Sequence, residues 1–315
     1  MADKSRIEWC DATWNPVTGC TQISEGCDNC YAKRYAERFR GRFGYPADDP
    51  FRVTFHEDRL EQPLRWQKPR KIFVCSMGDL FHDDVLDSCI VRILDIIWQA
   101  EKHTFLILTK RPERMQRIMG APSALNCYGH QWPFPNLWLG VTAENQRTAD
   151  ERIPILLDTP AAVRFVSVEP MLGPVDISPW DKCDLCGRLR NSFDGVWGSP
   201  FCYEHYNPFN GCEGTYKQNA LDWVVCGGES GPGARPMHPY WVRSLRDQSV
   251  NAGVPFFFKQ WGEYYPNWAE MPPRNINYNK PHVPIGGMLF VRCGKKAAGR
   301  ELDGREWNEF PQEVE

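Results

Sequence analysis

The chain has 315 residues, of which 42% are hydrophobic and 24% are charged, and its formal net charge at pH 7 is −3. This composition is ordinary for a folded globular protein and excludes a disordered or collagen-like chain. The small net charge gives no whole-chain signal for nucleic acid, and no run approaches the roughly 18 apolar residues of a membrane helix. The N-terminal sequence MADKSRIEWCD has no apolar core of a secretory signal, so we expect a cytoplasmic protein with no membrane partner.

Cysteine is unusually frequent, with 13 residues in the chain. Disulfides are rare in cytosolic proteins, and clustered thiols there indicate metal or redox chemistry. In chain order, a short extended segment at 13–17 is predicted to be the first strand. A loop with Cys20, Cys27 and Cys30 follows it, and a helix is predicted at 31–40.

Three interpretations of this loop stay open. Three thiolates hold a [4Fe–4S] cluster by three irons and leave the fourth iron open to a substrate or cofactor, whereas the usual electron-transfer cluster has four Cys ligands. A structural zinc site also needs four ligands, and Cys10 or His56 can supply the fourth. The thiols can also be unliganded.

Short, near-continuous apolar runs recur along the rest of the chain and are typical of strands buried on both faces of a parallel sheet. The predicted strands are 72–75, 104–108, 137–141, 163–168, 223–226 and 255–258. The predicted helices between them are 85–101, 112–119, 146–157 and 239–251. Successive strand ends are 33, 33, 27, 58 and 32 residues apart. A βα repeat of this length predicts an α/β fold, a partial or full parallel (β/α) barrel of TIM type or a doubly wound sheet.

The single long gap contains a second cluster of metal-ligand residues. Its members are Cys183, Cys186, Cys202, His205 and Cys212. Two ligand pairs, each two residues apart and separated by a loop, suit tetrahedral zinc, with Cys212 as the alternative to His205. A closed shell of four ligands indicates a structural role.

The domain organisation follows from this insertion. We predict an α/β barrel over 1–180 and 217–262, a zinc-binding insertion over 181–216, and a C-terminal extension over 263–315 that packs on the barrel.

Polar residues follow the predicted strands at the point where each strand ends. They are Ser76, Gly78 and Asp79, then Lys110 and Arg111, Thr142 and Glu144, Glu169, Gly227 to Gly231, and Lys259 to Trp261. In a parallel barrel the carboxyl ends of the strands form the face where substrates bind. With segment 13–17 as the first strand, the three-Cys loop opens onto the same face.

Several sequence motifs carry a family resemblance. They are WNPVTGCTQISEGCDNCYA, VCSMGDLF, LGVTAEN, SVEPMLGP, VVCGGESGPGARPM, FFKQWGE and LDGREWNEFP. The three-Cys loop after the first strand, with an aromatic residue directly after its last Cys, resembles radical S-adenosylmethionine (radical SAM) enzymes, although its x6/x2 spacing differs from their commonest x3/x2. The whole chain is similar to the phage Gp37/Gp68 family, a three-Cys-motif group related to radical SAM proteins.

The resemblance implies a cofactor and a reaction. Cys20, Cys27 and Cys30 would hold a [4Fe–4S] cluster whose open iron chelates S-adenosylmethionine (SAM). An electron from an external donor would cleave SAM to a 5′-deoxyadenosyl radical, which abstracts a substrate hydrogen.

The resemblance also implies roles for the residues at the strand ends. Ser76, Gly78 and Asp79 resemble a motif that accepts the SAM amino group, and Lys110 or Arg111 would pair with the SAM carboxylate. The other implied contacts are Thr142, Glu144 and Glu169 with ribose hydroxyls or substrate, and Gly227 and Gly228 with adenine. Glu169 and Lys110 are also catalytic candidates, while Glu169 and the glycines can equally be strand-end turns.

Two cysteines at strand ends, Cys75 and Cys226, can point into the barrel and donate a hydrogen atom to a product radical, and Cys226 is our third catalytic candidate. Each can instead be a small buried hydrophobe.

The sequence does not identify the substrate. A related DNA-repair radical enzyme, spore photoproduct lyase, makes modified or damaged DNA or RNA one possibility, and aromatic residues beside basic ones near 259–265 can stack on bases or pack in the core. One alternative is a non-catalytic zinc or iron–sulfur protein that recruits a partner or nucleic acid. Another is a metal-dependent hydrolase or nuclease that uses Asp79, Glu144 and Glu169.

Overall fold

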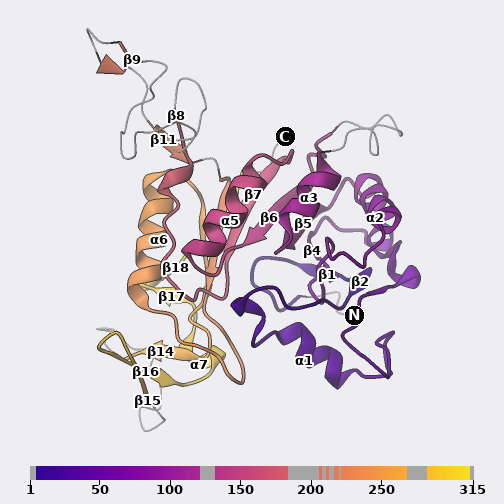
Figure 1. Ribbon diagram of the computed structural model, residues 1–315, viewed down its shortest axis with the longest axis horizontal. Coiled ribbons are helices and arrows are strands. Elements are labelled where there is room, and N and C mark those ends of the chain that lie inside the picture. Colours follow the sequence, from indigo (N-terminus) through magenta and orange to yellow (C-terminus); the bar gives the residue numbers. More distant parts are fainter. Residues whose placement is uncertain are drawn as a thin grey trace.

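Seven short apolar segments pair in parallel and form one sheet, in which spatial neighbours also follow one another in chain order (Figure 1). The computed structural model describes residues 5–120, 132–183, 206–207, 211–212, 216–219, 221–267 and 282–312. The strands are β1 (Ala12–Trp14), β4 (Lys71–Val74), β5 (Thr104–Thr109), β6 (Leu137–Thr142), β7 (Val163–Val168), β12 (Trp223–Gly227) and β13 (Phe256–Gln260). The predicted α/β class and parallel sheet are therefore confirmed.

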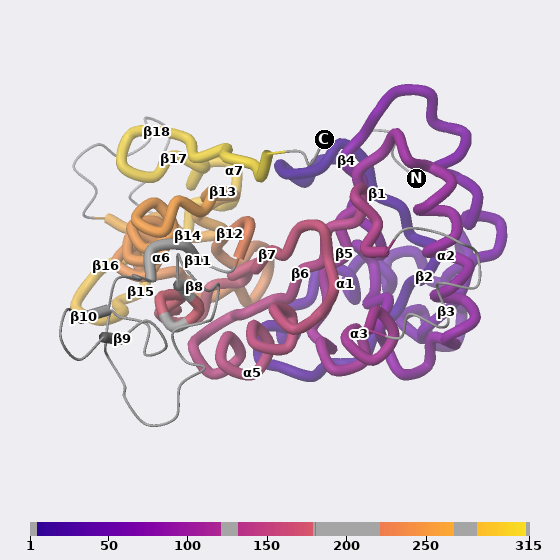
Figure 2. The backbone as a smooth tube through the Cα atoms, turned by 90° about the horizontal axis from the view of Figure 1, so that it is seen from above, coloured from indigo at the N-terminus to yellow at the C-terminus, as the bar shows by residue number. Residues whose placement is uncertain are grey.

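The sheet curls into a half-barrel and does not close. In the strand order of the sheet, β1 and β13 are the two edge strands. Figure 2 shows the strands as an arc with the helices outside it. A β-bridge joins Phe257 to Asn308, so the C-terminal segment lies along the edge at β13. The fold is thus compatible with the partial rather than the full barrel of the sequence prediction.

Helices follow the strands and cover the convex face of the arc (Figure 2). They are α2 (Asp87–Gln99), α3 (Pro112–Met119), α5 (Gln146–Leu157) and α6 (Pro239–Asn251), while α1 (Tyr31–Arg38) and α7 (Lys295–Ala298) lie elsewhere. Proline occupies the first turn of α3 and of α6, where its missing N–H costs no hydrogen bond. Asn145 caps α5 by accepting from the backbone N–H of Thr148 at 3.1 Å. These local signals explain why α3, α5 and α6 have the predicted bounds.

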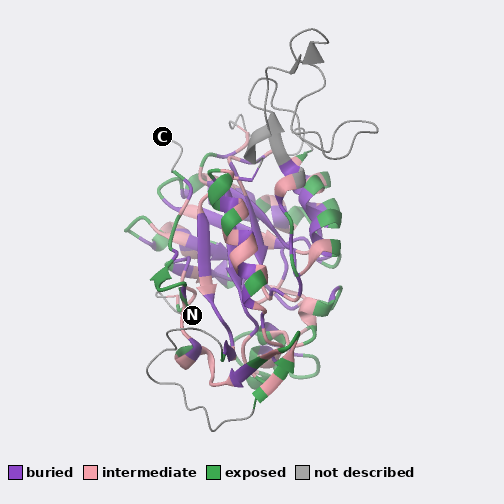
Figure 3. Cartoon of the chain, turned by 90° about the vertical axis from the view of Figure 1, so that its left-hand side faces the viewer, coloured by how far each residue is buried: buried purple, intermediate pink, exposed green. Residues whose placement is uncertain are grey.

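Two large clusters of buried residues lie one on each face of the sheet, whose strands are mostly buried (Figure 3), and a smaller cluster contains Ala234, Tyr264 and Phe290. On the convex face, strand residues pack with apolar residues of the four helices, among them Ile93, Met115, Leu156 and Val242. On the concave face an aromatic layer fills the half-barrel, with Trp9, Phe73, Trp138, Phe165, Trp223 and Phe257 as its large members. The central strands are buried on both faces, which is why their sequences are almost uniformly apolar.

Small antiparallel ladders complete the fold. They are β2 (Val17–Thr18) with β3 (Thr54–Phe55), β14 (Tyr264–Pro266) with β16 (Met288–Arg292) and β15 (His282–Ile285), and β17 (Glu301–Leu302) with β18 (Arg305–Glu306). Short 3-10 helices lie at Glu25–Cys27, Glu57–Arg59, Gln62–Arg65 and Ser178–Trp180.

The predicted zinc insertion is only partly described. β8 (Asp181–Cys183) pairs with β11 (Tyr216–Asn219), and β9 (Tyr206–Asn207) pairs with β10 (Gly211–Cys212), all antiparallel. Cys186, Cys202 and His205 lie outside the described residues, as do the side chains of Cys183 and Cys212. The zinc site therefore stays a prediction.

Candidate functional site

Residues 20–30, which we call the Cys loop, lie at the carboxyl edge of the sheet. The residue before the loop, Gly19, donates its N–H to the carbonyl of Met77 at 2.9 Å, directly after β4. At the other end of the loop, the Tyr31 hydroxyl donates to the carbonyl of Ser76. The expectation that the Cys loop opens onto the face formed by the strand ends agrees with these contacts.

A chain of polar contacts joins the end of β4 to the first cysteine. Buried Asp79 accepts from the Thr109 hydroxyl at 2.7 Å and from the Arg111 guanidinium at 3.0 Å. Arg111 in turn donates to Cys20 Sγ at 3.4 Å and to the hydroxyl and carbonyl of Thr21. The carboxylate of Asp79 is therefore already engaged and holds Arg111 against the Cys loop.

The thiol of Cys20 is held in its neutral form. Burial is the main cause and nearby Asp79 the second, while Arg111 acts in the opposite direction, and together they raise the pKa of Cys20 to about 11. Metal ligation requires a thiolate, so binding of an ion or cluster here must release a proton.

A second contact group fixes the middle of the Cys loop. Glu144, which follows β6 and is fully buried, accepts from Ser24 Oγ at 2.6 Å, from Lys110 Nζ at 2.5 Å and from Arg152 at 3.0 Å. Burial opposes the charge of this carboxylate, but the cations of Lys110 and Arg152 and the hydrogen bonds outweigh it, so the pKa of Glu144 falls to about 2. A Cβ at Gly26 would lie 2.4 Å from Glu144 Oε1, so the loop lies directly on this carboxylate.

A third contact group holds the end of the Cys loop against the segment after β12. Glu229 accepts from Arg235 at 2.8 Å and from Asn29 Nδ2 at 3.1 Å. Arg235 also donates to Asp28 at 3.2 Å and to the carbonyl of Glu25 at 2.8 Å. The Cys loop is thus anchored from the ends of β4, β5, β6 and β12.

A partly buried ion pair lies at the ends of β7 and β13. Lys259 Nζ donates to both oxygens of Glu169 at 2.8 and 2.9 Å, and Gly227 leaves space beside the pair. Burial opposes the charge of Lys259, yet Glu169 and nearby Glu8 and Cys10 outweigh it and raise the lysine pKa. Glu169 and Lys259 bond to each other and, among the described residues, make no hydrogen bond to the Cys loop.

Two of the predicted glycines, Gly78 and Gly228, lie against the protein's own backbone. A Cβ at Gly78 would lie 2.8 Å from the carbonyl oxygen of Gly19, and one at Gly228 would lie 2.0 Å from that of Trp261. Both glycines permit close approach of the protein's own backbone. Thr142 and Ser76 are buried, and Ser76 Oγ donates to Asn15 at 3.2 Å.

The hypothesis that Cys226 points into the barrel is wrong. Its neighbours Trp223 and Val225 belong to the concave aromatic layer, whereas Cys226 packs in the convex core, with Sγ 3.6 Å from Met171 Sδ. Side chains alternate along a strand, so Cys226 must face the helices. Cys75 also lies in the convex core, because its φ of 56° breaks the alternation after β4.

The two candidates for a fourth ligand of the three-Cys loop have other partners. Cys10 lies in the concave layer and donates to Ser5 Oγ at 3.2 Å, and His56 is buried with Nε2 2.8 Å from Thr18 Oγ1. Burial lowers the pKa of His56 to about 4. Across the described residues, no three His, Cys, Asp or Glu side chains are arranged as a ready metal site, although all three loop thiols are free and partly exposed. Their soft donor set fits an iron–sulfur cluster, and ligation requires the three side chains to turn to a common point.

Sequence reasoning missed Arg152, Arg235 and Ser24, which complete these contact groups. Arg152 lies on α5, eight residues after Glu144, which precedes the helix, and this spacing does not predict that the two side chains meet. Arg235 lies within the motif VVCGGESGPGARPM, but the motif does not reveal its contacts with the Cys loop, because Glu25 and Asp28 are about 200 residues away in the sequence.

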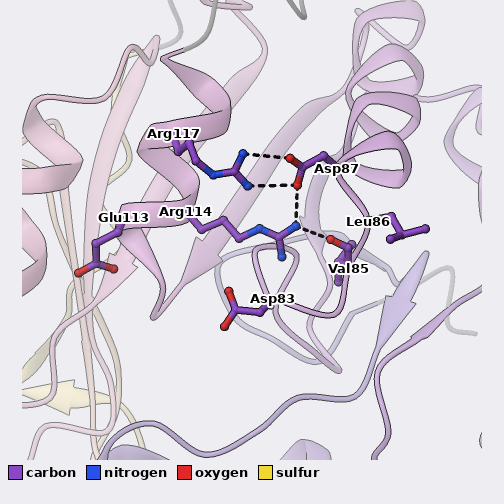
Figure 4. Close-up of a pocket in the computed structure, with 7 residues that line it drawn as sticks. All are labelled: Asp83, Val85, Leu86, Asp87, Glu113, Arg114 and Arg117. Carbon is purple, nitrogen blue, oxygen red and sulfur yellow. Dashed lines mark hydrogen bonds and ion pairs between the residues drawn. The ribbon is translucent and has the colours of Figure 1, made fainter.

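A pocket elsewhere on the surface is shown in Figure 4. It is lined by Asp83, Val85, Leu86, Asp87, Glu113, Arg114 and Arg117. Arg114 and Arg117 both donate to the carboxylate of Asp87, so its charged groups satisfy one another. None of the predicted site residues lines this pocket.

A family model described as "Protein of unknown function (DUF5131)" matches residues 4–311. The chain belongs to this family. No curated protein and no solved structure matches the chain. Within the described residues, no helix of the DUF5131 protein combines the length and apolar character of a membrane span.

Proposed function

We propose that this DUF5131 protein is a radical SAM-type enzyme related to the phage Gp37/Gp68 proteins, with a half-barrel of the radical SAM type. Cys20, Cys27 and Cys30 would hold a [4Fe–4S] cluster. When bound and reduced by an external electron donor, the cluster would supply the electron for cleavage of SAM to methionine and a 5′-deoxyadenosyl radical.

One observation carries the proposal. A loop with three free thiols is anchored across the carboxyl edge of a parallel half-barrel by charged residues that follow β5, β6 and β12, and the residues on either side of the loop bond to backbone carbonyls that follow β4. Loops at this edge carry the chemistry of parallel α/β folds, and a loop fixed from several strands holds its ligands in a constant position.

The residues of the chain have distinct tasks in this proposal. Arg111 is the cation that lies against Cys20, so it is the group we assign to the SAM carboxylate. Asp79 positions Arg111, and Glu144 positions Ser24 and Lys110, instead of contacting SAM directly. The Glu169–Lys259 pair, close to the aromatic layer of the concave face, is assigned to substrate binding.

The test is anaerobic reconstitution with iron and sulfide, followed by EPR of the reduced protein with and without SAM. The wild-type chain should bind about four iron atoms per cluster, give a reduced-cluster signal that changes when SAM is added, and release 5′-deoxyadenosine. A triple variant, Cys20→Ala, Cys27→Ala and Cys30→Ala, should take up no iron.

Cys89→Ala is the matched control, because Cys89 is a free, partly buried thiol on α2. It should retain the iron and the signal. If the wild-type Cys loop binds zinc and no iron, or if SAM leaves the EPR signal unchanged, the enzyme proposal is wrong. The protein is then a non-catalytic binding protein whose fold is stabilised by metal.

A further inference from the structure

Helix α1 and the residues after it carry two parallel stripes of side chains. Aromatic residues recur every four positions at 31, 35, 39 and 43, and arginines recur every four positions at 34, 38 and 42. Residues four apart lie on one face of a helix, about 6 Å apart along its axis. Ala32 and Ala36 are the buried residues of α1, so the helix packs through its alanine face and leaves Tyr31, Tyr35 and Arg38 exposed. α1 ends at Arg38, and residues 39–43 follow it as a turn.

The aromatic side chains are exposed to a degree unusual for their type. Tyr31 is 44% exposed, Tyr35 48% and Phe43 70%, in a protein whose other large aromatic residues mostly fill the core. Phe39 is half-buried beneath them, with its ring 6.1 Å from that of Tyr35 and 5.5 Å from that of Phe43. Neighbouring exposed rings of this kind indicate a contact surface.

The same segment concentrates positive charge. Residues 31–43 contain five basic side chains and one acidic side chain, whereas the whole chain has a net charge of −3. Arg40 pairs with Glu37, and Arg42 donates to the carbonyl of Arg38 at the helix end. Arg38 itself is exposed and makes no ion pair or hydrogen bond with the described residues, so its guanidinium is free for an anionic partner.

The stripes begin at the candidate site. α1 starts directly after Cys30, and the Tyr31 hydroxyl donates to the carbonyl that follows β4. Arg34 reaches the carbonyls of Ser230 and Pro232 after β12, at 3.3 and 3.4 Å. The exposed face of α1 therefore leads from the carboxyl edge of the half-barrel outward.

We infer that the exposed face of α1 and the turn after it binds single-stranded nucleic acid, with a phosphate on Arg38 and bases stacked on Tyr35, Tyr31 and Phe43. Flat exposed rings alternating with guanidinium groups match a partner that has both unpaired bases and a phosphate backbone. An acidic peptide would use the charge but not the row of rings. Binding of single-stranded nucleic acid by α1 does not depend on the proposed function. Only the statement that the bound strand is the enzyme's substrate rests on it.

The experiment measures fluorescence anisotropy of a labelled 20-nucleotide oligothymidylate with the full chain, without SAM or reductant. The variant Tyr35→Ala/Arg38→Glu removes one ring and reverses one charge on α1. Its control, Tyr240→Ala/Lys68→Glu, removes an exposed tyrosine on α6 and reverses the charge of an exposed lysine outside α1. Because the two variants have identical net charge, a difference between them reports the place of the change.

Wild-type affinity should fall as salt rises, and the α1 variant should bind at least about fivefold more weakly than the control with a smaller salt dependence. Photocrosslinking of the wild-type chain to an iodouracil-labelled strand should place the adduct within 31–43, a result that does not depend on the variant folding. Absence of wild-type binding at low salt, equal loss in both variants, or a concentration-dependent dimer lost only in the α1 variant would overturn the inference. The EPR test of the Cys loop is independent of all these outcomes.

Discussion

Replacing Glu144 with Gln removes one negative charge from the most buried contact group of the candidate site. The carboxylate has no exposed surface and neutralises Lys110 and Arg152, whose side chains are 19% and 6% exposed. Glutamine has nearly the same shape, but it leaves both cations without a counter-charge. It also weakens the hydrogen bond from Ser24, which fixes the middle of the Cys loop.

The size of the effect follows from the pKa of Glu144. A carboxyl with an ordinary pKa of 4.5 that titrates at about 2 in the folded protein stabilises the fold by about 3 kcal/mol at pH 7. Loss of one partner from a buried ion pair costs about the same. For a chain of 315 residues this lowers the melting temperature by about 5 °C.

The dependence on pH separates this charge effect from simple misfit. A lowered folded-state pKa contributes stability that is complete above the unfolded value of 4.5 and is lost as the pH falls toward 2. The difference in unfolding free energy between wild type and Glu144→Gln should therefore shrink from about 3 kcal/mol at pH 7 to about 1 kcal/mol at pH 3.

Urea unfolding at pH 7, 5, 4 and 3 measures this difference, and proteolysis of the native proteins reports the Cys loop, which should be cut faster in the variant. Glu57→Gln is the control, because Glu57 pairs with Arg92 on the surface, where side chains are 66% and 48% exposed. It should leave stability unchanged at every pH. A stability difference for Glu144→Gln that is absent, or equally large at pH 7 and pH 3, would refute the assignment of Glu144 as a buried, doubly paired anion.

Arg235→Ala leaves the buried carboxylate of Glu229 without its main partner, so we expect a loss of about 2 kcal/mol in unfolding free energy and faster proteolysis near Asp28, both measured beside the wild type. Unchanged protection of the Cys loop would contradict its anchoring from β12. Burial raises the pKa of Cys226 well above its ordinary value, so iodoacetamide at pH 8 should leave this thiol unmodified in the native protein and alkylate it after unfolding, as read by mass spectrometry. Rapid native labelling of Cys226 would restore it as an accessible group.

The elements of the half-barrel could be predicted from the sequence because their signals are local. Six apolar runs and the helices between them have a period and end signals that depend only on neighbours in the chain, and the bounds of α3, α5 and α6 agree to the residue. The gathering of polar residues at one edge also follows from sequence, since parallel strands must all end on the same side.

The tertiary structure decided what each of these residues contacts. Which face Cys226 occupies depends on a register of one residue, and an almost uniformly apolar strand does not reveal it. At Gly78 and Gly228 other backbone segments lie too close to leave room for a Cβ atom. The sequence near each glycine does not reveal this close approach. The sequence by itself determined that charged groups and thiols meet at one edge; only folding, which brings Arg235 to the Cys loop from about 200 residues away, determined which charges neutralise one another there.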